Sequence, residues 1–169
     1  MQCRSNIPNC ITLFRLIVAP IFFYTFLNDF HLISVVLLIF AFSSDALDGY
    51  IARKIGATSN KGAYLDVISD FILIITCFLA YVVPGWYDPL IMVLIIIMFL
   101  LFVATSGLKK PVYDPLGKYL GSYLMLMIFL TLLFPDPLIR QILVILLLFI
   151  CLTSVITRFF FFIRKSHPS

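Results

Sequence analysis

The chain has 169 residues, of which 63% are hydrophobic and 12% are charged, with a formal net charge of +4. A chain of this length forms one domain, which we expect to cover residues 1–169. The composition lies far from that of soluble proteins and predicts a protein of the lipid bilayer. The charge reflects membrane topology, described below, so we expect no nucleic-acid partner.

Six apolar segments follow one another along the chain, and crossing a bilayer takes about 20 apolar residues. In chain order they cover residues 11–28, 31–52, 63–83, 90–107, 117–134 and 138–162. The breaks between them carry turn residues, among them Asn28-Asp29, Pro84-Gly85 and Pro135-Asp136-Pro137. The sequence therefore predicts an all-α fold, an integral membrane bundle of six transmembrane helices.

The basic residues predict the orientation of this bundle, because cytoplasmic loops are enriched in Lys and Arg. With a cytoplasmic N-terminus, Arg140 is alone on the external side. The cytoplasmic side then holds Arg4, Arg15, Arg53, Lys54, Lys61, Lys109, Lys110, Lys118, Arg158, Arg164 and Lys165. We therefore expect both termini and the loop 54–61 in the cytoplasm, with the protein in the inner or plasma membrane.

Four aspartates, Asp45, Asp48, Asp66 and Asp70, lie in the second and third predicted helices. An ionised carboxylate in or near hydrocarbon is costly, so four together indicate a function. Their spacing of three and four residues places each pair on one helix face. Because a short polar loop joins the two helices into an antiparallel hairpin, the pairs can meet near the cytoplasmic surface.

Converging carboxylates repel one another unless cations lie between them. Oxygen ligands favour Mg²⁺ or Mn²⁺ over zinc, and two such ions about 4 Å apart would clamp a diphosphate. Gly49 and Gly62 would let phosphate approach the helix backbone closely, and Arg53 offers a bidentate fork for phosphate oxygens. The cluster therefore predicts a site for a diphosphate with two divalent ions.

The stretch from Asp45 to Asp70 reads D-x2-D-G-x2-A-R-x8-G-x3-D-x3-D. It resembles, in residue type and spacing, the signature of the CDP-alcohol phosphatidyltransferases. The segment NIPNCITLFR at residues 6–15 is similar to the N-x-P-N-x-x-T-x-x-R of glycerol-phosphate-type members. The resemblance implies transfer of a phosphatidyl group from CDP-diacylglycerol to an alcohol with release of CMP. It also implies a homodimer.

The resemblance implies a role for each matching residue. Asp45, Asp48 and Asp66 would hold one metal ion, and Asp66 and Asp70 would share a second. Asp70 would also be the catalytic base that takes the proton from the acceptor hydroxyl. The CDP-lipid would be bound by Asn9, Thr12, Gly49, Arg53 and Ser59, with Gly62 beside them.

The acceptor is expected to be water-soluble, most simply glycerol 3-phosphate, which would give phosphatidylglycerophosphate. Lys118, then Lys110 and Arg15, are the candidates for binding its phosphate. The segment DPLGKYLGS around Lys118 is similar to one in glycerol-phosphate-using members, although Leu120 replaces its second Lys. These lysines also obey the rule for cytoplasmic loops, so both interpretations stay open.

Val67 and Phe71 stand where phosphatidylglycerophosphate-forming members usually have Pro and Lys. Other acceptors therefore remain alternatives, namely phosphatidylglycerol, serine, inositol phosphate or choline. A cation-transport protein is an alternative of another class, since acids inside membranes also mark ion pathways. Against transport, the fourth to sixth segments carry no acid that would continue a path. A catalytically inactive scaffold is disfavoured because every position of the motif is intact.

Overall fold

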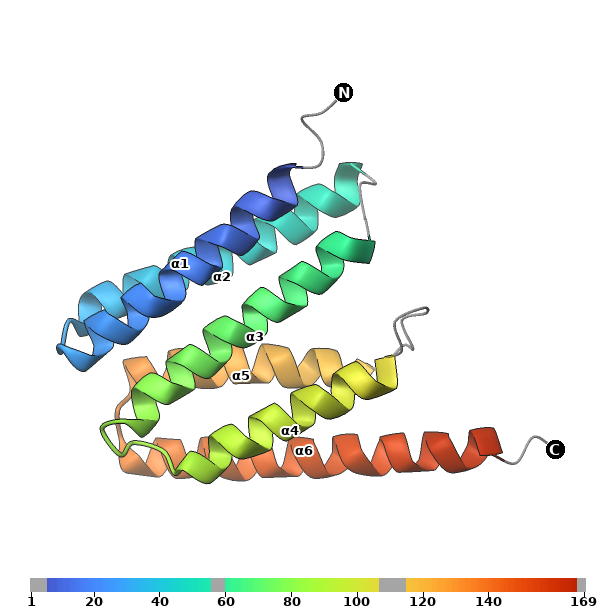
Figure 1. Cartoon of the computed structure of the whole chain (residues 1–169). Helices are drawn as coiled ribbons and strands as arrows, with labels where there is room; N and C mark the ends of the chain where they lie inside the picture. The colour runs from blue at the N-terminus through green and yellow to red at the C-terminus, as the bar shows by residue number, and fades with distance from the viewer. Residues whose placement is uncertain (1–5, 56–59, 107–114, 167–169) are drawn as a thin grey trace. The chain divides into compact units, whose positions relative to one another are not determined.

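A computed structural model describes the chain at residues 6–55, 60–106 and 115–166, and its side chains at 14–44, 67–104 and 119–158. Within these residues the fold is entirely helical, with six helices and no strand (Figure 1). In chain order they are α1 (Asn6–Leu27), α2 (His31–Ile55), α3 (Asn60–Val82), α4 (Pro89–Ser106), α5 (Pro115–Leu133) and α6 (Pro137–Ser166).

Each helix covers one of the predicted apolar segments, so the all-α expectation is confirmed for the described residues. The bounds differ most at the two ends of the chain. The first helix begins at Asn6 rather than at residue 11, and the last ends at Ser166 rather than at residue 162. Apolar character marks the part of a helix that avoids water, whereas the helix itself continues through polar residues at its ends.

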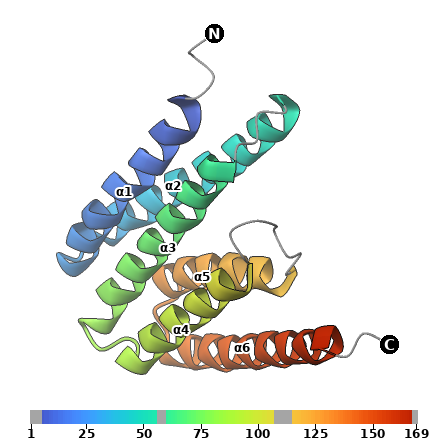
Figure 2. The same cartoon turned by 45° about the vertical axis from the view of Figure 1, so that its right-hand side comes forward.

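The contacts divide the chain into two compact units, Met1–Met92 and Val93–Ser169. In the first unit α1 packs against both α2 and α3. The two views show α1 running beside these helices along most of its length (Figures 1 and 2). In the second unit α5 packs against α6. The predicted single domain over residues 1–169 stays a prediction.

The core of the first unit is built on one face of α1. Arg15, Val18, Ala19, Phe22 and Phe26 are buried there, at the spacing of three and four residues that aligns side chains along a helix. The other two helices supply the facing apolar side chains, which are Leu38 and Ala41 of α2 and Leu73, Ile74, Cys77, Phe78, Ala80 and Tyr81 of α3. One residue of the α1 face is therefore charged, and it needs a partner.

Two helices of the first unit end in the same hydrogen-bonded motif. After α3, Gly85 N donates to Val82 O at 2.9 Å and Trp86 N donates to Tyr81 O at 2.9 Å. Gly85 has φ 77°, so this is a Schellman motif with glycine at the left-handed position. After α1, Asp29 N donates to Phe26 O and Phe30 N to Thr25 O, with Asp29 at φ 61°. The predicted turns at 28–29 and 84–85 are thus confirmed.

Aspartate and proline together begin α4 and α6. Asp88 Oδ1 accepts a hydrogen bond from Leu90 N at 2.8 Å, and Asp136 Oδ1 accepts one from Leu138 N at 2.7 Å. Each aspartate is followed by the proline that opens the helix, where its missing N–H costs nothing. These acids are therefore helix caps rather than members of the acidic cluster.

The outer faces of the helices are apolar. Leu32, Leu90 and Leu138 are among many large apolar side chains that are exposed. Among the described residues, one helical stretch, Pro137–Arg158, is long and apolar enough to cross a bilayer, with a mean hydropathy of 2.5. The shorter apolar stretches are Phe14–Leu27, His31–Ser44, Val67–Val82, Pro89–Ala104 and Tyr119–Leu133. A surface of this kind is suited to lipid rather than to water.

Candidate functional site

The backbone brings the motif residues to one end of the helical hairpin. Asp45 and Asp48 lie in the last three turns of α2, and Asp66 and Asp70 lie in the first three turns of α3. Only residues 56–59 separate the two helices. Because a chain extends at most about 3.6 Å per residue, the end of α2 and the start of α3 are within about 18 Å of each other. The two acidic pairs therefore share one end of the first unit.

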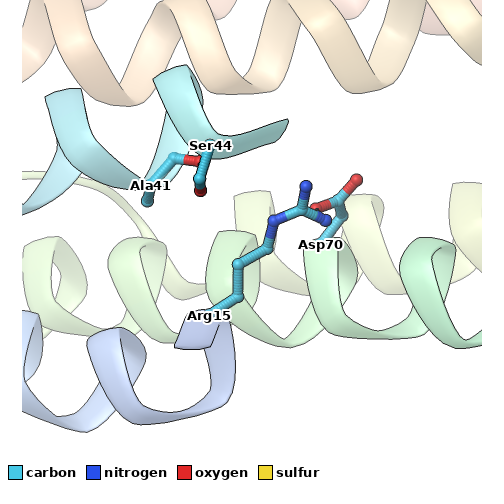
Figure 3. A network of polar contacts seen from close by, with 4 residues as sticks. All are labelled: Arg15, Ala41, Ser44 and Asp70. Carbon is cyan, nitrogen blue, oxygen red and sulfur yellow. Dashed lines mark hydrogen bonds and ion pairs between the residues drawn. The ribbon is translucent and has the colours of Figure 1, made fainter. Parts of the chain in front are cut away.

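Asp70 forms an ion pair with Arg15, the charged residue of the α1 face. The Arg15 guanidinium donates a hydrogen bond through Nη1 to Asp70 Oδ1 (Figure 3). The Arg15 side chain is 1% exposed and that of Asp70 is 23% exposed. Figure 3 shows the guanidinium reaching from α1 toward the carboxylate on α3. The predicted catalytic base is thus held by a buried cation from another helix.

The local sequence explains how an arginine comes to lie there. Arg15 precedes Val18, Ala19 and Phe22 on the buried face of α1, so helix periodicity turns it inward. Ser69, next to Asp70, is also buried, which places this turn of α3 against its neighbours. On α2, Ser44 Oγ donates to Ala41 O at 2.8 Å, which satisfies a hydroxyl directly before Asp45 (Figure 3).

The residues predicted to bind the CDP-lipid lie on described helices, with the exception of Ser59. Asn9 and Thr12 belong to α1, and Thr12 lies three residues before Arg15 on the same side of the helix. Gly49 and Arg53 belong to α2 at a spacing of four, and Gly62 belongs to the first turn of α3. Ser59 lies outside the described residues. The backbone therefore assembles positions from three helices around the end of the hairpin that carries the acids.

The predicted acceptor residues are divided between the two units and the residues outside the described structure. Arg15 is buried against Asp70, so its predicted contact with the acceptor phosphate stays a prediction. Lys118 lies in the first turn of α5, in the second unit, and Lys110 lies outside the described residues.

The donor chemistry of the four aspartates fits a divalent cation. They offer carboxylate oxygens, which suit Mg²⁺ and Mn²⁺, and no nitrogen or sulfur ligand accompanies them in the motif. Among the side chains described, no group of three or more His, Cys, Asp or Glu could hold a metal ion. Of the four aspartates, only Asp70 belongs to that part of the chain. Its carboxylate is paired with the guanidinium of Arg15.

A small hollow of about 80 Å³ lies at the opposite end of the first unit. It is lined by Phe26, Leu27, Asp29, His31, Pro84 and Trp86. Sites for small molecules enclose about 300–1,000 Å³, so a nucleotide would not fit there. The aromatic rings of Phe26, Tyr81 and Trp86 pack edge to face or in a stack beside it, with centroids 4.9–5.9 Å apart. This end is packed and carries none of the predicted site residues.

Sequence reasoning missed the pairing of Arg15 with Asp70. A signal for it was available, because a charged residue inside an apolar segment is expected to pair with an opposite charge. The sequence also did not indicate that Thr25 Oγ1 and Ser34 Oγ, 2.9 Å apart, join α1 to α2.

Comparison with known proteins agrees with the motif. The family model for CDP-alcohol phosphatidyltransferase matches residues 5–158, which include all four aspartates and Arg15. The chain therefore belongs to the CDP-alcohol phosphatidyltransferase family, as the resemblance implied.

Several similar proteins share one name, CDP-diacylglycerol–glycerol-3-phosphate 3-phosphatidyltransferase. That of Wigglesworthia glossinidia brevipalpis is 41% identical over 75 residues, which are 43% of this chain and 41% of the relative. That of Aquifex aeolicus is 37% identical over 76 residues, 45% of this chain and 43% of the relative. That of Bacillus subtilis is 33% identical over 100 residues, 48% of this chain and 52% of the relative. The chain thus matches about half of each relative's length or less.

Proposed function

We propose that this chain is an integral-membrane enzyme that transfers the phosphatidyl group of CDP-diacylglycerol to glycerol 3-phosphate and releases CMP. The observation that carries the proposal is the complete motif from Asp45 to Asp70, with both acidic pairs at the same end of the α2–α3 hairpin. Family membership supports the reaction class. The name shared by the similar proteins supports glycerol 3-phosphate as the acceptor.

The reaction needs a base, and Asp70 is our candidate. The acceptor hydroxyl oxygen attacks the phosphorus that carries diacylglycerol, the bond from this phosphorus to the CMP oxygen breaks, and CMP leaves. Asp70 takes the proton that the hydroxyl loses. The contact with Arg15 supports this role, because it fixes the direction of the carboxylate. When the base is held in a fixed orientation, the bound acceptor hydroxyl lies in the geometry that the reaction needs.

The diphosphate of the CDP-lipid needs compensation of its negative charge. The family uses divalent metal, and here Asp45, Asp48, Asp66 and Asp70 are the residues that would hold two Mg²⁺ or Mn²⁺ ions. When bound, the ions would neutralise the diphosphate and stabilise the leaving CMP. Arg53 would add a bidentate contact to phosphate, and Gly49 and Gly62 would leave space beside the backbone.

The apolar outer faces support six transmembrane helices, because all six helices carry apolar stretches, of which Pro137–Arg158 is long enough to cross a bilayer. In this arrangement both termini and the mouth of the active site face the cytoplasm, where CDP and a soluble acceptor are available. The acyl chains of the lipid substrate would remain in the bilayer. The protein would act as a homodimer, by analogy with its family.

An acceptor panel tests the proposal. The purified full chain would be given CDP-diacylglycerol, Mg²⁺ and, separately, glycerol 3-phosphate, phosphatidylglycerol, serine, inositol phosphate and choline, and CMP release would be measured. We expect release with glycerol 3-phosphate. Release with another compound alone would replace the acceptor, and no release with any of them would contradict the enzyme class.

A further inference from the structure

We propose that Arg15 is a positioning residue that holds Asp70 and weakens the binding of divalent cations at the acidic cluster. The guanidinium and the metal ion would then share one carboxylate. The inference rests on the proposed function in one respect only, which is that the four aspartates bind metal. It adds a role for Arg15 of α1, a residue outside the four aspartates.

The geometry separates Arg15 from an ordinary surface arginine. Its side chain is 1% exposed, and it reaches across from α1 to α3 to donate to Asp70 Oδ1. A carboxylate can accept from several partners at once, so binding of Asp70 to Arg15 is compatible with a metal ion at the same carboxylate. A planar guanidinium fixes the carboxylate in one orientation more firmly than an ammonium group does. Arg15 therefore sets the direction in which Asp70 faces its other partners.

The same contact has an electrostatic consequence. A positive charge within reach of a metal-binding carboxylate repels an incoming divalent ion, and water screens this repulsion less beside a buried guanidinium than at a fully exposed one. Removing the charge of Arg15 should thus tighten metal binding. A residue that only supported the packing of α1 against α3 would have the opposite effect, because its loss would loosen the cluster. The two roles therefore differ in the sign of the change in metal affinity.

A titration with Mn²⁺ distinguishes the electrostatic role of Arg15 from a purely structural one. The full chain is titrated in detergent without substrate, and free Mn²⁺ is measured by electron paramagnetic resonance. Arg15→Gln removes the charge but keeps hydrogen-bond donors. We expect it to bind Mn²⁺ tighter than the natural chain by about tenfold or more. Arg15→Lys keeps the charge and should stay within about threefold of the natural chain. In an Asp70→Asn background the Arg15→Gln change should lose its effect, because the shared carboxylate is gone.

Thr25→Val is the matched structural control. Thr25 lies on the same helix, is 7% exposed, and joins α1 to α2 through Ser34. It is ten residues from Arg15, or about 15 Å along a helix, so it should lower thermal stability without changing Mn²⁺ affinity. The inference would be overturned if Arg15→Gln bound Mn²⁺ as well as the natural chain does, or more weakly, while being at least as thermally stable as Thr25→Val. If Arg15→Gln does not fold, Arg15→Lys decides: its Mn²⁺ affinity must stay near that of the natural chain while its kcat falls.

Activity measurements separate this inference from the proposed function. Metal-dependent CMP release by the natural chain, with no gain in Mn²⁺ affinity in Arg15→Gln, would refute the inference alone. The expected gain in Mn²⁺ affinity, without CMP release by the natural chain, would refute the proposed reaction and leave the role of Arg15 standing. In an active enzyme, Arg15→Lys should lower kcat more than it raises the KM for the CDP-lipid, because the orientation of the base is what changes.

Discussion

Arg15 of α1 and Asp70 of α3 form an ion pair across 55 residues of sequence, and the arginine is almost fully buried. The pair joins the first helix to the acidic end of the α2–α3 hairpin. Removing one partner of a buried pair commonly costs about 3–5 kcal/mol, because the other charge is left buried. Any substitution of Asp70 therefore changes both the chemistry and the docking of α1, and the two effects must be measured separately.

The two Schellman motifs predict opposite effects of two substitutions. Gly85→Ala should destabilise the protein by about 1–2 kcal/mol, because a Cβ is unfavourable at its φ of 77°. No atom lies within 4 Å of the place where this Cβ would be, so the cost is conformational. Asp29→Gly, at φ 61°, should be neutral or stabilising. Thermal denaturation in detergent would measure both, and a stabilising Gly85→Ala would contradict the assignment.

Metal removal should abolish CMP release. EDTA should stop the reaction and excess Mg²⁺ or Mn²⁺ should restore it, since carboxylates alone cannot neutralise a diphosphate. Zinc should restore it poorly, because the motif offers no nitrogen or sulfur ligand. Full activity in chelator would exclude the two-ion arrangement.

Lys118→Ala should raise the KM for glycerol 3-phosphate by about 10- to 100-fold. This change corresponds to the loss of one charge-assisted hydrogen bond to the acceptor phosphate. The KM for the CDP-lipid should change little, because Arg53 and the aspartates bind that substrate. Lys165→Ala removes the same charge on the same predicted side of the membrane and serves as the control. Equal KM values for the acceptor in the two variants would favour a lipid or neutral acceptor.

The predicted orientation can be checked by cysteine labelling from outside the cell. In a chain with Cys3, Cys10, Cys77 and Cys151 replaced, single cysteines at Ser59 and Ser169 should be protected. A cysteine at Pro135, in the exposed turn between α5 and α6, should be labelled. Labelling of either cytoplasmic position without permeabilisation would reverse the topology and the location of the active site.

The sequence predicted the six helices because apolar segments and turn residues are local signals. Asn28-Asp29 and Pro84-Gly85 mark ends that the structure confirms. The sequence did not predict which of Asn28 and Asp29 takes the left-handed conformation, since both residue types tolerate it. The acidic cluster was predicted from the types and spacing of its residues and from their resemblance to a family signature, and it stays a prediction.

The partner of Asp70 could not be predicted in the same way. It depends on how α1 packs against α3, and the charge of Arg15 was attributed to membrane topology and to binding of the acceptor phosphate. Its position in the buried stripe with Val18, Ala19 and Phe22 becomes informative only when the facing helix is known. A local pattern thus predicted which residues are chemically active, and that stays a prediction, whereas tertiary packing determined that Arg15 and Asp70 are paired.

The proposed reaction and its base are tested together by comparing CMP release from CDP-diacylglycerol and glycerol 3-phosphate by the natural chain and by Asp70→Asn. Loss of a general base costs about 10²–10⁴-fold in rate. Asn retains an oxygen that can accept from Arg15, so the variant should still bind the CDP-lipid, and binding should be measured below its melting temperature. We predict CMP release by the natural chain and a loss of at least about 100-fold in the folded variant. Near-normal CMP release by a folded Asp70→Asn protein would contradict the assignment of the base.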